Sequence, residues 1–496
     1  MEEIYFGTDG WRAIVGQGFD ERNVRRVAHA TARAFLEEVQ AQDGCSPRLI
    51  VGYDTRADAD RFARLTAEVV ARTAATYYSE LGLEVVLSDR YVPTPCLCWA
   101  IAHDERAIGG IQLTASHNPA QWLGLKVRMR DGGASPAEFT RRIENLLPEA
   151  QNLDSEVTAG SNLVTKDILT DYLDALYRFI DADAIRSVNL KIVVDPLYGA
   201  ARGYLADTFE RLGVQVVRVH DDADPTFGGL HPEPIEPWTD SAARAVVQTG
   251  AAAGFVSDGD ADRLGALDEE GTFVSPHKII ALLAMHLVEN RGKRGAIVKT
   301  LSTSQLVDRI GEELGVPVTT TPIGFKWIYA EMLAGDVLIG GEESGGIGIP
   351  GHVFERDGLL MSLLLAEMMA QSGQSLRDLV AELEARAGTF YYDRFDLTLD
   401  QQQIQRFRQE LPTLRPATVA DAPVLQYNHT DGAKFALAAT EANGRSSDSD
   451  DSGGGEWLLL RASGTEPLVR IYAESATAQR TAELIAAGTQ LVLEGT

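Results

Sequence analysis

The sequence has few cysteines, no long apolar run and a shortage of positive charge. Its three cysteines show no CxxC spacing and no neighbouring His cluster, which indicates reduced thiols and not a disulfide framework. No apolar stretch approaches the roughly 18 residues that span a bilayer, and the first residues lack the basic and apolar regions of a signal peptide. A net charge of −27 argues against nucleic-acid or anionic-membrane partners. We therefore expect a soluble cytoplasmic protein.

Strand-like apolar runs alternate with helical patterns over most of the chain, which predicts α/β layers with largely parallel sheets. Three successive blocks contain these runs, at 48–54, 83–88 and 107–113, at 190–196, 214–220 and 253–260, and at 295–300, 316–324 and 336–346. The C-terminal part instead reads as strands followed by a terminal helix near 476–492, which predicts a small α+β domain. We expect four domains, over residues 1–160, 161–268, 269–388 and 389–496.

Each expected domain has one loop with an unusual set of residues after a strand, where ligands collect in open α/β sheets. In the first loop, TASHNP, Ser116 and His117 follow the run 107–113, and Pro119 cannot continue a strand. Serine and asparagine are also ordinary turn residues, so this window alone leaves a structural turn open.

The second loop, SDGDADR, contains three aspartates at alternate positions. In an extended chain Asp258, Asp260 and Asp262 point to one side, where their charges repel unless a cation lies between them. Oxygen ligands alone suit Mg²⁺. The spacing resembles an EF-hand, but Arg263 occupies the position that requires glycine. A solvated acidic turn is the alternative.

The third loop, GGEESGG, offers Glu342 and Ser344 after a buried strand. A carboxylate with a hydroxyl two residues on can bind sugar hydroxyls, although glycine-rich turns are common and the signal is weak alone. Near the first loop, Arg12 in FGTDGWR and Lys126 are cations that can stabilise a transferring phosphoryl group or move a proton.

The fourth loop, RASGTEPLVR, has the composition of a phosphate site. Two guanidinium groups, two hydroxyls and backbone N–H groups favour a bound phosphate. They would also supply the local positive charge that the acidic chain otherwise lacks. The residues concerned are Arg461, Ser463, Gly464, Thr465 and Arg470. A surface hairpin with scattered arginines is the alternative.

Taken together, GTDGWR, TASHNP, DGDADR, GEESGG and RASGTEP resemble the α-D-phosphohexomutase family, in family order and along the whole chain. The resemblance implies three related α/β domains with mixed, largely parallel sheets and a smaller C-terminal α+β domain around a central cleft. It also implies an isomerase that interconverts hexose 1-phosphate and hexose 6-phosphate. The phosphoryl group would pass through a phosphoserine enzyme and a hexose 1,6-bisphosphate, which acts as intermediate and activator.

The resemblance further implies roles for individual residues. Ser116 would carry the phosphoryl group, and Arg12, Lys126 and, more weakly, His117 would move protons and neutralise charge. One Mg²⁺ per subunit would be bound by the phosphate oxygen of Ser116 and by Asp258, Asp260 and Asp262. The residues implied in substrate binding are Arg263, Gly324, Glu342 and Ser344, with Arg461, Ser463, Gly464, Thr465 and Arg470 for the phosphate that is not transferred. The expected partners are small sugar phosphates, and the protein is expected to be a monomer or a dimer.

The loop GEES resembles phosphoglucomutases more than the GEMS of many phosphomannomutases or the GEQS of phosphoglucosamine mutases, which favours glucose. The other two sugars remain alternatives, as does a phosphatase in which water replaces the sugar hydroxyl, or a non-catalytic binding protein. Two features depart from the family pattern. His352 lies farther from Ser344 than in relatives, and the polar segment 441–455, expected to be a disordered loop, has no counterpart.

Overall fold

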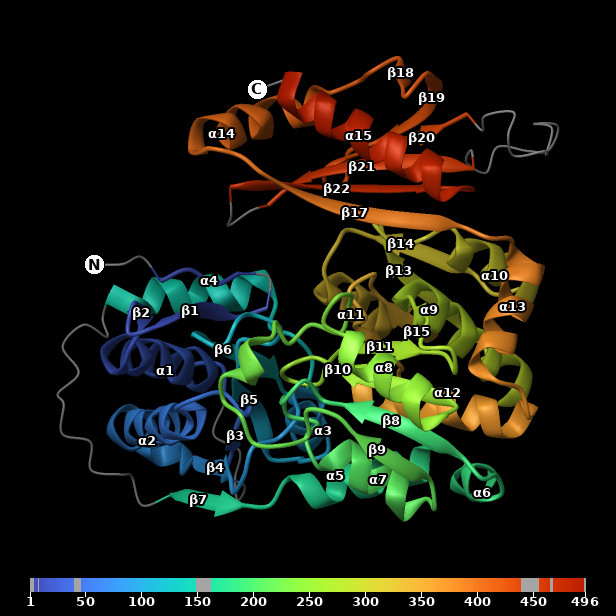
Figure 1. Cartoon of the computed structure of the whole chain (residues 1–496). Coiled ribbons are helices and arrows are strands. Elements are labelled where there is room, and N and C mark those ends of the chain that lie inside the picture. The colour runs from blue at the N-terminus through green and yellow to red at the C-terminus, as the bar shows by residue number, and fades with distance from the viewer. Residues whose placement is uncertain are drawn as a thin grey trace. The chain divides into compact units, whose positions relative to one another are not determined.

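The computed structural model describes residues 4–7, 9–39, 46–148, 162–438, 455–463 and 467–494. Cys45 and nearly all of the polar segment 441–455 lie outside these residues. The chain forms two compact units, the first of Met1–Val298 with Gly324–Glu382 and the second of Lys299–Ile323 with Leu383–Thr496 (Figure 1). Within the described ranges, every helix is too short or too polar to cross a membrane.

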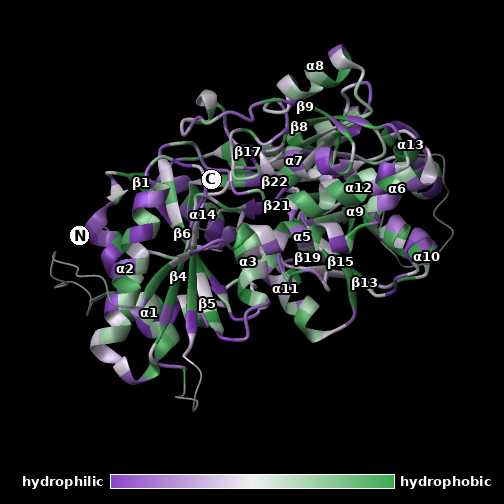
Figure 2. Ribbon diagram, turned by 90° about the horizontal axis from the view of Figure 1, so that it is seen from below, coloured by the Kyte–Doolittle hydropathy of each residue, from purple (hydrophilic) through white to green (hydrophobic). Residues whose placement is uncertain are grey.

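The first sheet of the first unit has the strand order β2-β1-β6-β5-β3-β4-β7. Its strands are β1 (Trp11–Val15), β2 (Gly18–Phe19), β3 (Arg48–Tyr53), β4 (Glu84–Ser88), β5 (Ala107–Leu113), β6 (Trp122–Met129) and β7 (Leu163–Lys166). Its helices are α1 (Glu21–Leu36), α2 (Ala59–Tyr77), α3 (Thr94–Ala102) and α4 (Ala137–Leu146). The strands β4 and β5 are strongly hydrophobic (Figure 2), as expected of inner strands that are buried on both faces. Because β6 runs antiparallel to β5, the chain turns back just after residue 113.

The second sheet has the order β12-β11-β10-β8-β9. Its strands are β8 (Lys191–Asp195), β9 (Gln215–Arg218), β10 (Ala253–Ser257), β11 (Leu264–Leu267) and β12 (Phe273–Val274). The helices in this part of the chain are α5 (Leu169–Phe179), α6 (Ala182–Arg186), α7 (Tyr204–Arg211) and α8 (Asp240–Thr249). The strand β10 is parallel to β8 and antiparallel to β11, so the aspartate loop leaves the carboxyl end of a central strand.

The third sheet places β15 (Val337–Gly341) between β13 (Ala296–Thr300) and β16 (Ile347–Gly348). The helices of the first unit in this region are α9 (Pro276–Met285), α11 (Phe325–Ala334) and α12 (Gly358–Ser372). Residues 358–369 of α12 are all buried, which explains why they are apolar except for Ser362 and Glu367. The loop GGEESGG connects β15 to β16.

The second unit contains α10 (Leu306–Leu314), β14 (Val318–Thr321) and an antiparallel sheet of order β17-β22-β21-β20-β19-β18. The strands of this sheet are β17 (Tyr391–Thr398), β18 (Thr418–Val419), β19 (Ala422–Asn428), β20 (Ala433–Leu437), β21 (Glu456–Ala462) and β22 (Leu468–Ser475). Its helices are α14 (Gln401–Glu410) and α15 (Ala478–Glu494), and α13 (Leu376–Ala387) crosses from one unit to the other.

The predicted fold class, α/β with mixed sheets and a smaller α+β part at the C-terminus, is confirmed. The expectation of strands followed by one terminal helix is incomplete, because α14 lies between β17 and β18. This helix begins with a capping box of Asp400 and Gln403, and it is too polar to show a clear apolar stripe in the sequence. The four domain boundaries remain predictions.

Candidate active site

Ser116 lies in the turn that connects β5 to β6. The residue is 1% exposed, and its φ of 52° is a left-handed conformation that costs free energy in a residue other than glycine. Its amide N–H donates to Thr114 Oγ1 at 2.8 Å, and its hydroxyl donates to Asp258 Oδ2 at 2.9 Å. The structure therefore brings the predicted phosphoryl carrier to the predicted metal site.

The three aspartates of the second loop are fully buried together. Asp258, Asp260 and Asp262 each offer a carboxylate oxygen, and these oxygens lie within 4.8 Å of one another. Burial, and then the charges of Asp262 and Asp260, raise the pKa of Asp258 well above its ordinary value. Burial also acts to raise the pKa of Asp260, but the charge of Lys126 and hydrogen bonds from Lys126 and Thr94 lower it overall.

The unpaired oxygens of this cluster fit a divalent cation. Asp260 Oδ1 and Asp262 Oδ1 are buried and have no hydrogen-bond partner among the described residues. A buried carboxylate oxygen without a partner is costly unless a cation compensates it. Because all the donors are oxygens, the chemistry of the cluster suits Mg²⁺ better than a softer metal.

Lys126 on β6 is a counter-charge of the aspartate cluster. Its Nζ lies 2.8 Å from Asp260 Oδ2, 3.0 Å from Asp262 Oδ2 and 2.8 Å from Asp9 Oδ2. Burial acts to lower the pKa of Lys126, but the three carboxylates raise it above its ordinary value. The ammonium group is therefore charged at neutral pH in the absence of a metal ion, and it supplies positive charge to the cluster.

Asp9 is a site residue that the sequence reasoning missed. Besides Lys126, its carboxylate binds Arg128 Nη1 at 2.8 Å and Arg356 Nη2 at 2.9 Å. Burial acts to raise its pKa, but Arg128, Lys126 and Arg356 hold the pKa of Asp9 well below its ordinary value. The only signal in the sequence is an aspartate beside glycine in GTDGWR, which does not separate a site residue from a turn.

Two further predicted catalytic residues, Arg12 and His117, lie near Ser116: Arg12 contacts the serine turn, and His117 is part of it. Arg12 projects from β1, and its Nη1 donates to Asn118 Oδ1 at 2.6 Å. Burial, and then the charges of Arg263 and Arg12, lower the pKa of His117 well below its ordinary value, so its imidazole is neutral at pH 7. The ring of His117 lies 6.3 Å from that of His231, measured between centroids.

Arg263 connects the aspartate loop with the loop GGEESGG, called the sugar loop below after its predicted role. Its amide N–H donates to Asp258 Oδ1 at 3.1 Å, and its Nη1 lies 3.0 Å from Glu233 Oε1. Arg263 also forms an isolated β-bridge with Gly346, and the next residue, Leu264, donates its N–H to the carbonyl of Gly345 at 3.0 Å. These contacts fix the sugar loop beside the aspartates.

In the sugar loop, Glu342 is buried and Ser344 is partly exposed. The turn is closed by the N–H of Glu342, which donates to the carbonyl of Gly346 at 3.0 Å. Burial raises the pKa of Glu342 to about 7, against the opposing charge of Arg356. Arg356, which sequence reasoning missed, lies 3.7 Å from Glu342 Oε2 and 2.8 Å from Asp262 Oδ2 through its guanidinium nitrogens.

Local structure accounts for the residues at positions 352 and 324. His352 contacts a helix cap, and Gly324 has a backbone conformation that favours glycine. His352 Nε2 lies 3.1 Å from Asp357 Oδ2, and Asp357 caps the N-terminus of α12. Gly324 precedes α11 with φ 124°, a conformation that favours glycine. No contact of Gly324 with the serine turn or the aspartates is found among the described residues, and its substrate role stays a prediction.

In the second unit, Arg461 on β21 and Arg470 on β22 lie directly opposite each other. Like charges in this position destabilise a sheet unless they are compensated. Arg461 Nε lies 3.0 Å from Asp431 Oδ1, and Arg470 Nε lies 3.7 Å from Asp396 Oδ2. Asp431 and Asp396 therefore compensate the two like charges, which lie side by side at one end of the strands.

Ser463 continues from β21 toward the loop of the fourth motif. Its carbonyl accepts a hydrogen bond from Arg408, a third arginine that sequence reasoning missed because it lies on the unpredicted helix α14. Gly464 and Thr465 lie outside the described residues.

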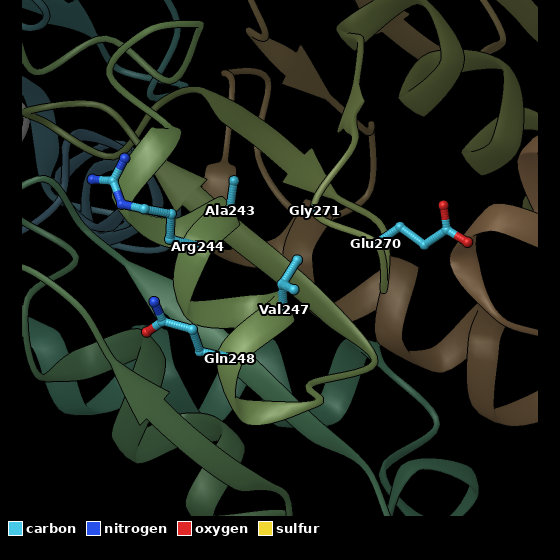
Figure 3. Close-up of a pocket in the computed structure, with 6 residues that line it drawn as sticks. All are labelled: Ala243, Arg244, Val247, Gln248, Glu270 and Gly271. Carbon is cyan, nitrogen blue, oxygen red and sulfur yellow. The ribbon is translucent and has the colours of Figure 1, made fainter.

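One hollow in the surface lies apart from these residues. It has a volume of about 300 Å³ and is lined by Ala243, Arg244, Val247, Gln248, Glu270 and Gly271 (Figure 3). None of the predicted site residues lines it, and its residues offer no convergent set of polar groups.

Comparison with models of known protein families identifies the family to which these residues belong. Four family models match the chain, described as phosphoglucomutase/phosphomannomutase α/β/α domains I, II and III and C-terminal domain. They cover residues 3–154, 170–271, 275–387 and 428–489. They define the class of the protein as a phosphohexomutase, which is an isomerase.

Individual relatives agree with this class over the whole chain. A phosphoglucomutase/phosphomannomutase of Thermococcus kodakarensis is 29% identical, over 99% of this chain and 98% of its own. A phosphoglucosamine mutase of Moorella thermoacetica is 30% identical over 99% of both chains. The crystal structure of a protein from Thermus thermophilus, provisionally named phosphomannomutase, is 34% identical over 99% of both chains, with a TM-score of 0.83. The chain belongs to the α-D-phosphohexomutase family.

Proposed function

We propose that this phosphohexomutase is a phosphoglucomutase in which Ser116 carries the phosphoryl group between glucose 1-phosphate and glucose 6-phosphate. The observation that supports the carrier role is the buried hydroxyl of Ser116, 2.9 Å from Asp258 in a cluster of three buried carboxylates. A phosphoryl group transfers when its charge is neutralised and its oxygens are aligned. A cation held by the three carboxylates, together with Lys126, would supply that positive charge beside the hydroxyl of Ser116.

Asp258, Asp260 and Asp262 would hold Mg²⁺ together with an oxygen of phosphorylated Ser116. The ion supplies positive charge that stabilises the transferring phosphoryl group. Lys126 adds an ammonium group and Arg12 adds a guanidinium beside the turn, and both would neutralise charge and assist proton transfer. His117, whose pKa is lowered by burial, is a weaker candidate for accepting the proton of the attacking sugar hydroxyl.

The substrate would be held by its hydroxyls and by the phosphate that is not transferred. Glu342 and Ser344 would bind the 3- and 4-hydroxyls, with Arg263 near the reacting phosphate. Arg461, Ser463, Gly464, Thr465 and Arg470 would bind the other phosphate. Phosphorylated Ser116 gives its phosphoryl group to the free hydroxyl, the resulting glucose 1,6-bisphosphate reverses its orientation, and the second phosphate returns to Ser116.

The carrier role is tested by mass spectrometry of the Ser116 peptide. After incubation with glucose 1,6-bisphosphate we expect a mass increase of about 80 Da, one phosphoryl group. Ser116→Ala should abolish this increase and nearly all turnover, whereas the exposed control Ser187→Ala should change neither. Normal turnover by Ser116→Ala would refute the mechanism. Release of inorganic phosphate in place of isomerisation would favour the phosphatase alternative.

The sugar preference needs a separate measurement. Glucose and mannose share the 3- and 4-hydroxyls, so Glu342 and Ser344 alone do not distinguish them, and differences at the 2-position are worth about 1–3 kcal/mol. We expect a higher kcat/KM for glucose 1-phosphate than for mannose 1-phosphate or glucosamine 1-phosphate. A clear preference for one of the other sugars would leave the phosphohexomutase assignment intact and overturn the choice of glucose.

A further inference from the structure

The guanidinium group of Arg56 binds the backbone of the turn that contains Ser116. Arg56 follows β3, and its Nη2 donates to the carbonyls of Ser116 at 2.5 Å and Asn118 at 2.6 Å. Its Nη1 donates to the carbonyls of Pro119 at 2.9 Å and Trp122 at 3.1 Å. Four carbonyl oxygens of residues 116–122, which form the turn and the start of β6, thus converge on one side chain.

Arg56 is itself fixed with little freedom to move. Its Nε lies 3.2 Å from Asp54 Oδ2, and its backbone N–H donates to Asp54 Oδ1 at 3.0 Å. The side chain is 1% exposed, and its guanidinium carbon lies 4.9 Å from the centre of the Phe227 ring. An arginine has five side-chain N–H groups, and the five hydrogen bonds from Nε, Nη1 and Nη2 account for all of them.

The position of Arg56 follows from the sheet. The end of β3 is paired with the end of β5, with Tyr53 opposite Leu113, and the N–H of Asp54 donates to the carbonyl of Leu113 at 3.0 Å. Residues that leave β3 therefore lie beside the turn that leaves β5. A lysine at position 56 would keep the charge, but its three donors on one nitrogen cannot reproduce a planar fork that serves four separated carbonyls.

We propose that Arg56 is a positioning residue for phosphoryl transfer, which holds the left-handed backbone of Ser116 so that its hydroxyl is aimed at Asp258. This inference rests on the proposed role of Ser116 as phosphoryl carrier. Arg56 acts through the turn, and none of its contacts is with a residue that we assign to the sugar or to its distal phosphate. Losing it should therefore slow the chemical step and leave substrate binding nearly unchanged.

The test is Arg56→Lys in the full-length enzyme with Mg²⁺, compared with Arg26→Lys. Arg26 is also a buried arginine of the first unit, but it binds Asn23 on α1. Since a misplacement of about 1 Å can cost about 10²-fold in rate, we expect kcat for glucose 1-phosphate to fall about 10²-fold in Arg56→Lys. KM should stay within about twofold. Phosphorylation of Ser116 by glucose 1,6-bisphosphate, followed by mass spectrometry, should slow in parallel, and Arg26→Lys should change neither rate.

A second variant separates positioning from folding. Arg56→Gly removes the side chain, and free guanidinium ion should restore part of its kcat without a matching rise in melting temperature. The inference is overturned if Arg56→Lys keeps a normal kcat, if its loss appears in KM, or if guanidinium rescues only stability. Wild-type enzyme that never forms phosphoserine would overturn the proposed function together with this inference, whereas normal phosphoserine formation in Arg56→Lys would overturn this inference alone.

Discussion

Replacing Lys126 with methionine should destabilise the metal-free protein and at the same time strengthen its binding of Mg²⁺. The Lys126 side chain is 1% exposed, and its ammonium group contacts Asp9, Asp260 and Asp262 at 2.8–3.0 Å. Methionine keeps the length and flexibility of the side chain, so the change in packing is small. What is lost is the positive charge that compensates the buried carboxylates of Asp260 and Asp262 and the partly buried carboxylate of Asp9.

The size of both effects follows from this charge. Removing one partner of a buried ion pair costs about 3–5 kcal/mol, and we expect a loss in that range in EDTA. When Mg²⁺ is bound, Asp260 and Asp262 regain a cation, and Asp9 still contacts Arg128 and Arg356. If the ion recovers about half of the loss, Mg²⁺ binds at least about tenfold more tightly to the variant, since 1.4 kcal/mol corresponds to tenfold.

Calorimetric unfolding in EDTA and in saturating Mg²⁺, together with titration calorimetry of Mg²⁺, measures these quantities. The control is Lys166→Met, because Lys166 forms an exposed ion pair with Glu84 at 2.6 Å and such pairs contribute less than about 1 kcal/mol. Equal losses of stability in EDTA and Mg²⁺, or weaker Mg²⁺ binding by Lys126→Met, would refute the reasoning.

Two further predictions concern the carboxylates. Asp260→Asn removes a charged ligand, so Mg²⁺ affinity by titration calorimetry and turnover should both fall; unchanged affinity would favour a plain acidic turn. For Glu342, burial raises the pKa from 4.5 to about 7, so between these values the folded protein holds a proton that the unfolded chain has released. The stability from this group is present at low pH and is lost as the pH rises through about 7. Glu342→Gln should therefore gain stability relative to wild type between about pH 5 and pH 8, as measured by urea unfolding, and a constant difference would contradict the assignment.

The strands and the loops that follow them could be predicted from the sequence alone. The runs 107–113 and 253–260 became β5 and β10 with its aspartate loop, because apolar strands bounded by proline, glycine and aspartate are local signals. The polar helix α14 could not be predicted in this way. Only two of its residues, Ile404 and Phe407, are buried, and two residues are too few for a clear helical period.

Which charges meet, by contrast, depends on the tertiary structure. Ser116 lies 142 residues from Asp258 in the chain, and Asp9 lies 347 residues from Arg356, yet each pair is in contact. Nothing local in the sequence marks Asp9, Arg56 or Arg356 as site residues. The free energy of a buried charge depends on the groups around it in space, and the packing of the sheets in the first unit sets those distances.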